Sequence, residues 1–259
     1  MTRVLVTNDD GVESAGIRAL AGVAVAAGLD VVVAAPSWDS SGASASLTAV
    51  EEAGRFLVDG RHWDDLPDVP VHAVEAAPAF IVRAGLEGAF GGRPDVVLSG
   101  INIGQNTGTS VLHSGTVGAV LTASTHGCRG LAVSIAMGGP LQWETPAAFA
   151  ARALEWLLDA PPSTALNLNV PDVPVDEVRG LVRAHLSSSG VVQATLTEVG
   201  KGYVKLSYIE GNGHLEPKSD AALLAAGCAT VTPLLAPSEA AEVDTVALTE
   251  TRPRVNPQA

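Results

Sequence analysis

Residues 4–11 read Val-Leu-Val-Thr-Asn-Asp-Asp-Gly, an apolar strand that stops at two adjacent carboxylates. Side by side at a strand end, Asp9 and Asp10 would repel each other and lose water, which pushes one of them toward protonation. A divalent cation removes this penalty by giving both carboxylates a partner. Because open α/β folds bind ligands at the carboxyl ends of their strands, the stretch indicates a hard-metal site at a sheet edge. A solvated turn is the alternative, since Asn, Asp and Gly are common turn residues.

The composition fits one large domain, or one domain with an appendage. The chain has 259 residues, of which 47% are apolar, and this is enough for a sizeable core. Its formal net charge of −13 argues against non-specific binding to nucleic acid or to an anionic membrane. An anionic substrate would therefore need a local attraction, from a metal ion, backbone N–H groups or a helix N-terminus.

Cysteine usage and hydropathy favour a cytoplasmic protein. Cys128 and Cys228 make no disulfide framework, and we expect both to be reduced core residues. The N-terminus enters a strand without the pattern of a signal peptide. No apolar run approaches the roughly 20 residues that a membrane helix needs.

Strands and helices alternate along the first half of the chain. Strands that are apolar on both faces suit a parallel sheet covered by helices on each side. The repeated order predicts a doubly wound α/β fold. We expect strands at Arg3–Thr7, Val31–Ala35, Val71–Val74, Asp95–Leu98 and Leu131–Ile135, helices at Gly16–Ala27, from Pro78 to Leu86 and at Val117–Thr125, and a long loop from Ser99 to Ser114.

The pattern changes after residues 138–140, Gly-Gly-Pro. We expect residues 1–140 to form the core with the metal and phosphate site, and residues 141–259 to complete it and add a hairpin arm at about 180–215. The expected elements are helices at Thr145–Leu158 and Ser219–Ala226, strands at Ala165–Val170 and Ala229–Pro233, antiparallel strands at Gly180–His185, Val191–Thr197 and Tyr203–Ile209, and a mobile C-terminal end.

Three loops of small or oxygen-bearing residues follow the expected strands, and a doubly wound fold would bring them together. They are residues 8–11, 40–46 and 99–109, the last continuing through His113 into Ser114-Gly115-Thr116. Carboxylate, hydroxyl and amide oxygens are ligands of Mg²⁺, Mn²⁺ or Ca²⁺. Residues 114–116 open a helix and would cradle a phosphate through free N–H groups, or serve only as an ordinary helix cap.

Several familiar motifs are absent. No His/Cys cluster has zinc spacing. The glycines at 100, 104 and 108 do not form a dinucleotide fingerprint, which speaks against a dehydrogenase. No P-loop and no nucleophile elbow are present.

These motifs, in this order, resemble the SurE family, the survival-protein nucleotidases. The resemblance covers most of the chain and is densest in residues 3–135. It is carried by residues 4–11 with Gly16-Ile17, Ala35-Pro36, Ser41–Ser44 and Ser46–Thr48, most strongly by Pro94–Asn106, then by His113–Ala119, and more weakly by Leu168–Pro171, Ser219-Asp220 and Val231–Leu234.

The resemblance implies a metal-dependent phosphomonoesterase that hydrolyses nucleoside 5′- and 3′-monophosphates. It also implies a Rossmann-like, mostly parallel sheet with a smaller C-terminal β-hairpin and oligomerisation part, assembled as a homodimer or homotetramer. One divalent ion per subunit is expected, Mg²⁺ or Mn²⁺. The metal ligands map onto Asp9, Asp10, Ser41 and Asn102, the catalytic residues onto Asp9, Asp10 and Asn102, and the phosphate pocket onto Asn8, Gly42, Asn106, Ser114, Gly115 and Thr116.

The chain departs from the family pattern in two segments. Residues 37–40 are Ser-Trp-Asp-Ser where the family has Asp-Arg-Asn-Arg, so two positive side chains are missing. Residues 76–81 are Ala-Ala-Pro-Ala-Phe-Ile where the family has Gly-Thr-Pro-Ala-Asp-Cys. Two alternatives therefore stay open: a phosphatase of broader, non-nucleotide specificity, and a nucleotide- or metabolite-binding protein with weak or lost phosphatase activity.

Two further side chains and the mechanism remain to be placed. His113 suits protonation of a leaving alcohol, although a packed or water-bonded histidine is the simpler interpretation. Trp38 would stack on a base or pack at a subunit contact. For the reaction we favour attack by water on the metal, with an aspartyl-phosphate on Asp9 as the variant.

Overall fold

A nine-stranded, mostly parallel sheet organises the computed structural model, which describes residues 1–188, 192–200, 203–210 and 215–239. The strand order is β10-β13-β9-β8-β7-β1-β2-β6-β5, and only the pairs β5·β6 and β9·β13 are antiparallel. The strands are β1 (Arg3–Thr7), β2 (Asp30–Pro36), β5 (Val58–Arg61), β6 (Val71–Val74), β7 (Val96–Ile103), β8 (Arg129–Ile135), β9 (Ala165–Val170), β10 (Leu181–Arg183) and β13 (Ala229–Leu234).

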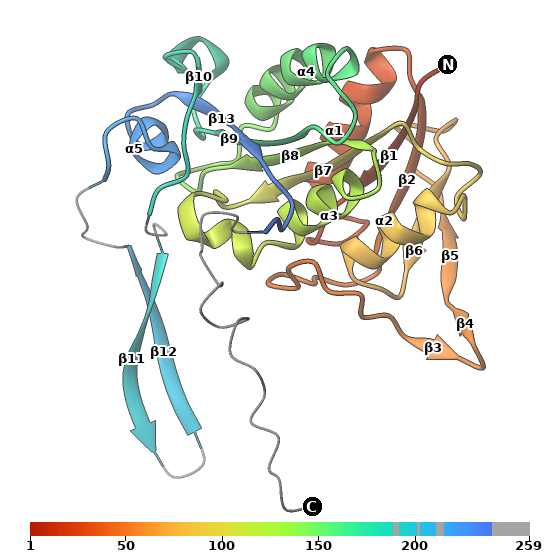
Figure 1. Cartoon of the computed structure of the whole chain (residues 1–259), viewed down its shortest axis with the longest axis horizontal. Coiled ribbons are helices and arrows are strands. Elements are labelled where there is room, and N and C mark those ends of the chain that lie inside the picture. The colour runs from red at the N-terminus through yellow and green to blue at the C-terminus, as the bar shows by residue number, and fades with distance from the viewer. Residues whose placement is uncertain (189–191, 201–202, 211–214, 240–259) are drawn as a thin grey trace, which may run out of the picture.

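Helices cover both faces of this sheet, which confirms the doubly wound α/β fold (Figure 1). On one face α1 packs beside α4, and on the other α2 packs beside α3. Pro78 occupies the first turn of α2, as its fixed backbone angle favours. The helices are α1 (Ala15–Ala26), α2 (Pro78–Leu86), α3 (Gly115–Ser124), α4 (Glu144–Leu158) and α5 (Asp220–Ala225), with 3₁₀ turns η1 (Gly108–Leu112) and η2 (Val175–Glu177).

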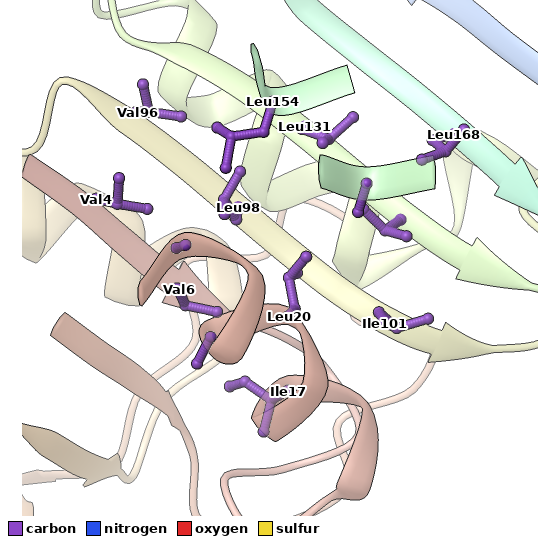
Figure 2. Close-up of a cluster of buried hydrophobic side chains, with 14 of the residues drawn as sticks. Val4, Val6, Ile17, Leu20, Val96, Leu98, Ile101, Leu131, Leu154 and Leu168 are labelled. Atoms are coloured by element: carbon purple, nitrogen blue, oxygen red, sulfur yellow. The ribbon is translucent and has the colours of Figure 1, made fainter. Parts of the chain in front are cut away.

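The apolar strands contribute to cores on both faces of the sheet because successive side chains of a strand point to opposite faces. Val4 and Val6 of β1 join the core beneath α1 and α4, whereas Leu5 joins the core beneath α2 and α3. Figure 2 shows the first core, where Ile17 and Leu20 of α1 lie over the sheet with Leu154 of α4. A sequence that is apolar at every strand position therefore predicts this two-faced burial correctly.

The strand order creates a crevice at the end of β1. The chain moves from β1 to β2 on one side and returns to β7 on the other, so the connections leave in opposite directions. Such a switch point is where open α/β sheets bind ligands. Thr7 pairs with Ser99 in the register of β1 and β7, so residues 8–10 and 100–103 emerge side by side.

The predicted loop from Ser99 to Ser114 is wrong in its first part, because β7 continues to Ile103. The strand keeps its pairing with β8 through a register shift between Ser99 and Asn102. Gly100 permits this: its φ is +129°, and a Cβ there would lie 2.2 Å from the Val133 carbonyl oxygen. Small polar residues are typical of a loop, but here they form the bulged end of a strand.

The second half corrects one further expectation and confirms another. The segment Gly180–His185 was expected to be antiparallel and part of the arm, but β10 pairs in parallel with β13 in the main sheet. The antiparallel hairpin is confirmed as β11 (Val192–Gly200) and β12 (Tyr203–Glu210), which projects away from the sheet in Figure 1. The predicted mobile C-terminal end and oligomerisation segment fall largely in residues 240–259, outside the described residues.

A short excursion between β2 and β6 was not predicted. It contains the two-stranded ribbon of β3 (Glu51–Glu52) and β4 (Arg55–Phe56), and then β5 at the sheet edge. These strands are exposed and very short, so neither periodicity nor apolar runs mark them. Among the described residues, no helix combines the length and apolar character needed to cross a membrane.

Candidate functional site

The crevice at the ends of β1 and β7 holds a cavity of about 310 Å³. Six of the predicted site residues line it: Asp9, Ser41, Gly42, Asn102, Asn106 and Ser114. The remaining lining residues are Ile103, Gly104, Gln105, Ser110, His113 and Met137. Residues from three separate loops therefore meet where the strand order predicts a ligand site.

Asp9 is held from behind by the start of α3. The residue is 3% exposed, and the Thr116 hydroxyl donates a hydrogen bond to its Oδ1. A Cβ on Gly115 would lie 2.7 Å from Asp9 Oδ2, so only glycine lets the helix approach this closely. Burial raises the pKa of Asp9, while hydrogen bonds from Thr116 and Gly115 act in the opposite direction.

The Asp10 carboxyl group has a raised pKa and one oxygen without a hydrogen-bond partner among the described residues. Its pKa is raised to about 7, first by burial and then by the charges of Asp9 and Asp39, against a backbone hydrogen bond from Ile103. Its Oδ2 atom is buried and has no hydrogen-bond partner among the described residues. A buried, unpaired carboxylate oxygen beside a second carboxylate is the arrangement that a cation would relieve.

Ser41 and Asn102 present oxygens from the opposite loops. The Ser41 N–H and hydroxyl both donate to Asp39 Oδ1, at 2.9 and 2.6 Å, and these bonds lower the pKa of Asp39. Asn102 Nδ2 donates to the Gly104 carbonyl at 2.7 Å, which leaves its Oδ1 free for another partner. Asp39 was not among the predicted site residues, although it stands in the segment where the basic run is missing.

The donor set fits a hard divalent cation. No group of three or more His, Cys, Asp or Glu side chains suited to a metal occurs in the part of the chain that the structure describes. The site instead offers two carboxylates, one hydroxyl and one amide, the oxygen ligands that Mg²⁺ and Mn²⁺ accept.

Three of the predicted phosphate-binding residues face the cavity. Asn106 is fixed by its N–H, which donates to Asn169 Oδ1 at 2.7 Å, and by its Nδ2, which donates to Ser134 Oγ at 3.0 Å. Ser114 caps α3 by accepting from the Val117 N–H at 3.1 Å. A Cβ added at Gly42 would have no atom within 4 Å. A second amide hydrogen of Asn106 thus remains available to a ligand, and Gly42 leaves room for one.

The other four predicted residues, Asn8, Asp10, Gly115 and Thr116, lie outside the cavity wall. Asn8 is fully buried, and its Nδ2 donates to the Gly11 carbonyl at 2.9 Å and to Ser14 Oγ at 2.8 Å. It therefore shapes the turn that presents the aspartates. Gly115 and Thr116 face Asp9, so the structure places them behind the carboxylate rather than in the wall.

A second cavity, of about 430 Å³, adjoins the first across the loop after β2. Ser41 and Gly42 line both cavities. Trp38 and Ala77 line only the second, and Ala77 belongs to the segment that departs from the family pattern. The sequence predicts Trp38 as a candidate for stacking on a base. In the structure Trp38 lines the second cavity together with Ser41 and Gly42, which also line the first.

Comparisons with known proteins identify the family of the chain and a solved relative of its fold. The family model described as Survival protein SurE matches residues 4–193. A protein named 5′-nucleotidase SurE from Geobacter metallireducens is 35% identical over 242 residues, 90% of each chain. One of the same name from Brucella canis is 33% identical, over 90% of this chain and 91% of that one. The crystal structure of Sure protein from Aquifex aeolicus superposes with a TM-score of 0.79 at 28% identity, covering 96% of this chain and all of that one.

Proposed function

The chain belongs to the Survival protein SurE family, and from this premise we propose that it is a metal-dependent phosphomonoesterase that hydrolyses nucleoside 5′- and 3′-monophosphates to nucleoside and phosphate. The observation that supports this most directly is the cavity of about 310 Å³, which gathers Asp9, Ser41 and Asn102 in one wall. Asp10 adds a buried carboxylate oxygen without a partner.

We propose that one Mg²⁺ or Mn²⁺ per subunit is held by Asp9, Asp10, Ser41 and Asn102. When bound, such an ion supplies positive charge that polarises a phosphoryl oxygen and lowers the pKa of water. The chain contributes preorganisation, because Thr116 fixes the Asp9 carboxylate and the Gly104 carbonyl fixes the Asn102 amide. The bound cation would also attract an anionic substrate to a protein whose net charge is −13.

Donors in the same wall would stabilise charge on the transferred phosphoryl group. Asn106 offers its second amide hydrogen, since the first is donated to Ser134, and Gly42 lines the cavity without a side chain that would obstruct a ligand. Fixed donors of this kind act where charge develops and need no reorganisation during the reaction.

The adjoining cavity supports a nucleotide as the substrate. Since Ser41 and Gly42 line both cavities, one ligand would reach from one to the other. A phosphate in the first cavity would leave its nucleoside in the second, where Trp38 offers an aromatic face for a base.

The test is phosphate release from 5′- and 3′-nucleotides, p-nitrophenyl phosphate and glycerol phosphate, each with Mg²⁺ or Mn²⁺ and with chelator. We expect metal-dependent turnover that Asp10→Asn abolishes and that Asp176→Asn, which removes an exposed charge outside the cavity wall, leaves intact. Trp38→Ala should raise KM for nucleotides but not for p-nitrophenyl phosphate, and Trp156→Ala, another exposed tryptophan, should change neither.

Other outcomes would replace the proposal. Equal kcat/KM for nucleotides and glycerol phosphate would establish a phosphatase of broader specificity. Thermal stabilisation by nucleotides without turnover in any metal would establish a binding protein instead.

We also propose that the subunit assembles as a homodimer or homotetramer in the cytoplasm. Leu112, which is 69% exposed, and Leu235, which is 87% exposed, lie on the surface, and the β11–β12 hairpin stands clear of the sheet (Figure 1). Light scattering after size exclusion measures the assembly, and a monomer at micromolar concentration would contradict it.

A further inference from the structure

We propose that His113 is the general acid of the phosphatase proposed above, donating a proton to the oxygen that leaves phosphorus. The inference rests on the proposed function and adds the residue that completes it. A sugar alkoxide is a strong base and leaves poorly unless it is protonated as its bond to phosphorus breaks. The site therefore needs a proton donor next to the phosphate.

Among the twelve described residues that line the cavity, two carry side chains that can ionise, Asp9 and His113. Asp9 is buried, accepts from the Thr116 hydroxyl and belongs to the proposed metal site. The other ten lining residues carry amide, hydroxyl, thioether or hydrocarbon side chains, or none. Histidine is also the side chain that most often serves as a general acid, so His113 is the donor that the wall supplies.

The backbone of His113 is tied down on both sides. Its N–H donates to the Ser110 carbonyl at 3.0 Å, and its carbonyl accepts from the Ser44 N–H at 3.2 Å. The Ser44 hydroxyl donates to the neighbouring Leu112 carbonyl at 2.7 Å. The loop carrying His113 is thus joined to the loop carrying Ser41, which fixes the place from which the imidazole reaches the cavity.

The imidazole is also open to water, because His113 is exposed as well as part of the cavity wall. It can therefore recover a proton from solvent after each turnover. A packed histidine, the simpler interpretation of the sequence, would be shielded from both the cavity and water.

The step balances without another reactant. Water forms the new bond from its oxygen to phosphorus, and the bond between phosphorus and the ester oxygen breaks. The ester oxygen keeps the electron pair and takes the proton from the His113 imidazolium, giving the alcohol. The proton lost by the attacking water returns to solvent, and solvent reprotonates His113.

Two substrates with different leaving groups test the inference. The 5′-oxygen of AMP needs a proton, whereas p-nitrophenolate is stable as an anion and leaves without one. We expect His113→Gln to lower kcat for AMP by about 10²–10⁴-fold and to lower kcat for p-nitrophenyl phosphate far less. His62→Gln, which changes an exposed histidine of the β5–β6 connection, should leave both rates unchanged.

The remaining outcomes overturn the inference. An equal fall in kcat for AMP and for p-nitrophenyl phosphate would show that His113 only positions the loop. A rise in the inhibition constant of inorganic phosphate as large as the fall in kcat for AMP would show the same. Unchanged AMP hydrolysis would show that the leaving group is protonated in another way. Wild-type protein that hydrolyses neither substrate would instead refute the proposed function itself.

Discussion

The Thr116 hydroxyl donates a hydrogen bond to Oδ1 of Asp9, which joins the first turn of α3 to the end of β1 across 107 positions of sequence. Thr116→Val keeps the shape of the side chain and removes this donor. We expect the affinity for Mn²⁺ and the value of kcat to fall about 10–100-fold, as when a partner of a metal ligand is lost. Calorimetric titration with Mn²⁺ and steady-state kinetics measure the two quantities.

Two further variants serve as controls for Thr116→Val. Thr116→Ser keeps a hydroxyl and should retain most of the affinity. Thr122→Val removes a hydroxyl that only donates to the Gly118 carbonyl within the same helix, and should leave metal binding unchanged. If Thr122→Val and Thr116→Val lost affinity equally, damage to α3 would explain the effect instead.

The pKa of Asp10, raised to about 7, predicts how pH acts on the metal-free protein and on metal binding. Because the folded state disfavours the charged carboxylate, metal-free stability should decline as pH rises from 3.8, the ordinary pKa of an aspartate, toward 7. Metal binding requires the carboxylate to be deprotonated, so the apparent affinity should fall by about tenfold per pH unit below 7. Urea denaturation in chelator and Mn²⁺ titration, each across this range, check both slopes.

Asp10→Asn is the matched variant for these measurements. It cannot ionise, so its metal-free stability should lack most of the decline seen in the wild-type protein. A wild-type slope that Asp10→Asn reproduces would assign the titration to another group.

The fold could be predicted largely because its central strands are apolar at every position. Val4–Val6 and Val31–Val33 are buried on both faces, and this pattern fits a parallel sheet between helices. Polar or exposed strands carried no such signal. Ser99–Ile103 extends β7 through a glycine-containing bulge, and β10 lies at the sheet edge where pairing depends on the distant β13. Register and partner choice of this kind arise from tertiary contacts that a local pattern does not contain.

The site could be predicted at the level of its loops but not of its individual contacts. Asp9, Ser41 and Asn102 meet in one cavity because parallel strands end at one edge, which the order of the elements implies. That Asn8 turns inward to Ser14, and that Thr116 faces a carboxylate, depends on side-chain geometry. Asp39 was missed because only the structure shows that it fixes Ser41.

The two cysteines should differ in reactivity. Cys128 is 3% exposed, as predicted, and burial raises the pKa of its thiol to about 11. Cys228 is only partly buried, so the expectation that both cysteines are core residues is wrong for this one. We expect the native protein to titrate one fast thiol with Ellman's reagent at mildly alkaline pH, and two after denaturation. Cys228→Ser should abolish the fast reaction, and a fast thiol that survives this change would contradict the assignment.

Asp220 should be a stability determinant of the segment at the start of η1. Its buried carboxylate accepts N–H groups from Gly108 at 2.8 Å, Ser187 at 2.9 Å and Ala221 at 2.8 Å. Asp220→Ala leaves buried donors without this partner, and we expect a loss on the order of 3 kcal/mol in the free energy of unfolding. Since Gly108 begins η1, activity should fall as well. Asp176→Asn is the control for charge alone, and an equal effect of the two variants would contradict the prediction.

Two glycines of α1 should respond in opposite directions to alanine. A Cβ on Gly16 would lie 2.1 Å from the Ile101 carbonyl oxygen, whereas Gly22 has nothing within 4 Å of that position. Gly22→Ala should raise the free energy of unfolding by about 0.8–1 kcal/mol, because alanine favours the helix. Gly16→Ala should lower it by about 1–3 kcal/mol through overpacking, and should reduce activity because Ile101 precedes Asn102, a proposed metal ligand. Urea denaturation of the two variants measures both effects; if Gly16→Ala were as stable as Gly22→Ala, the close contact between α1 and β7 would not exist in solution.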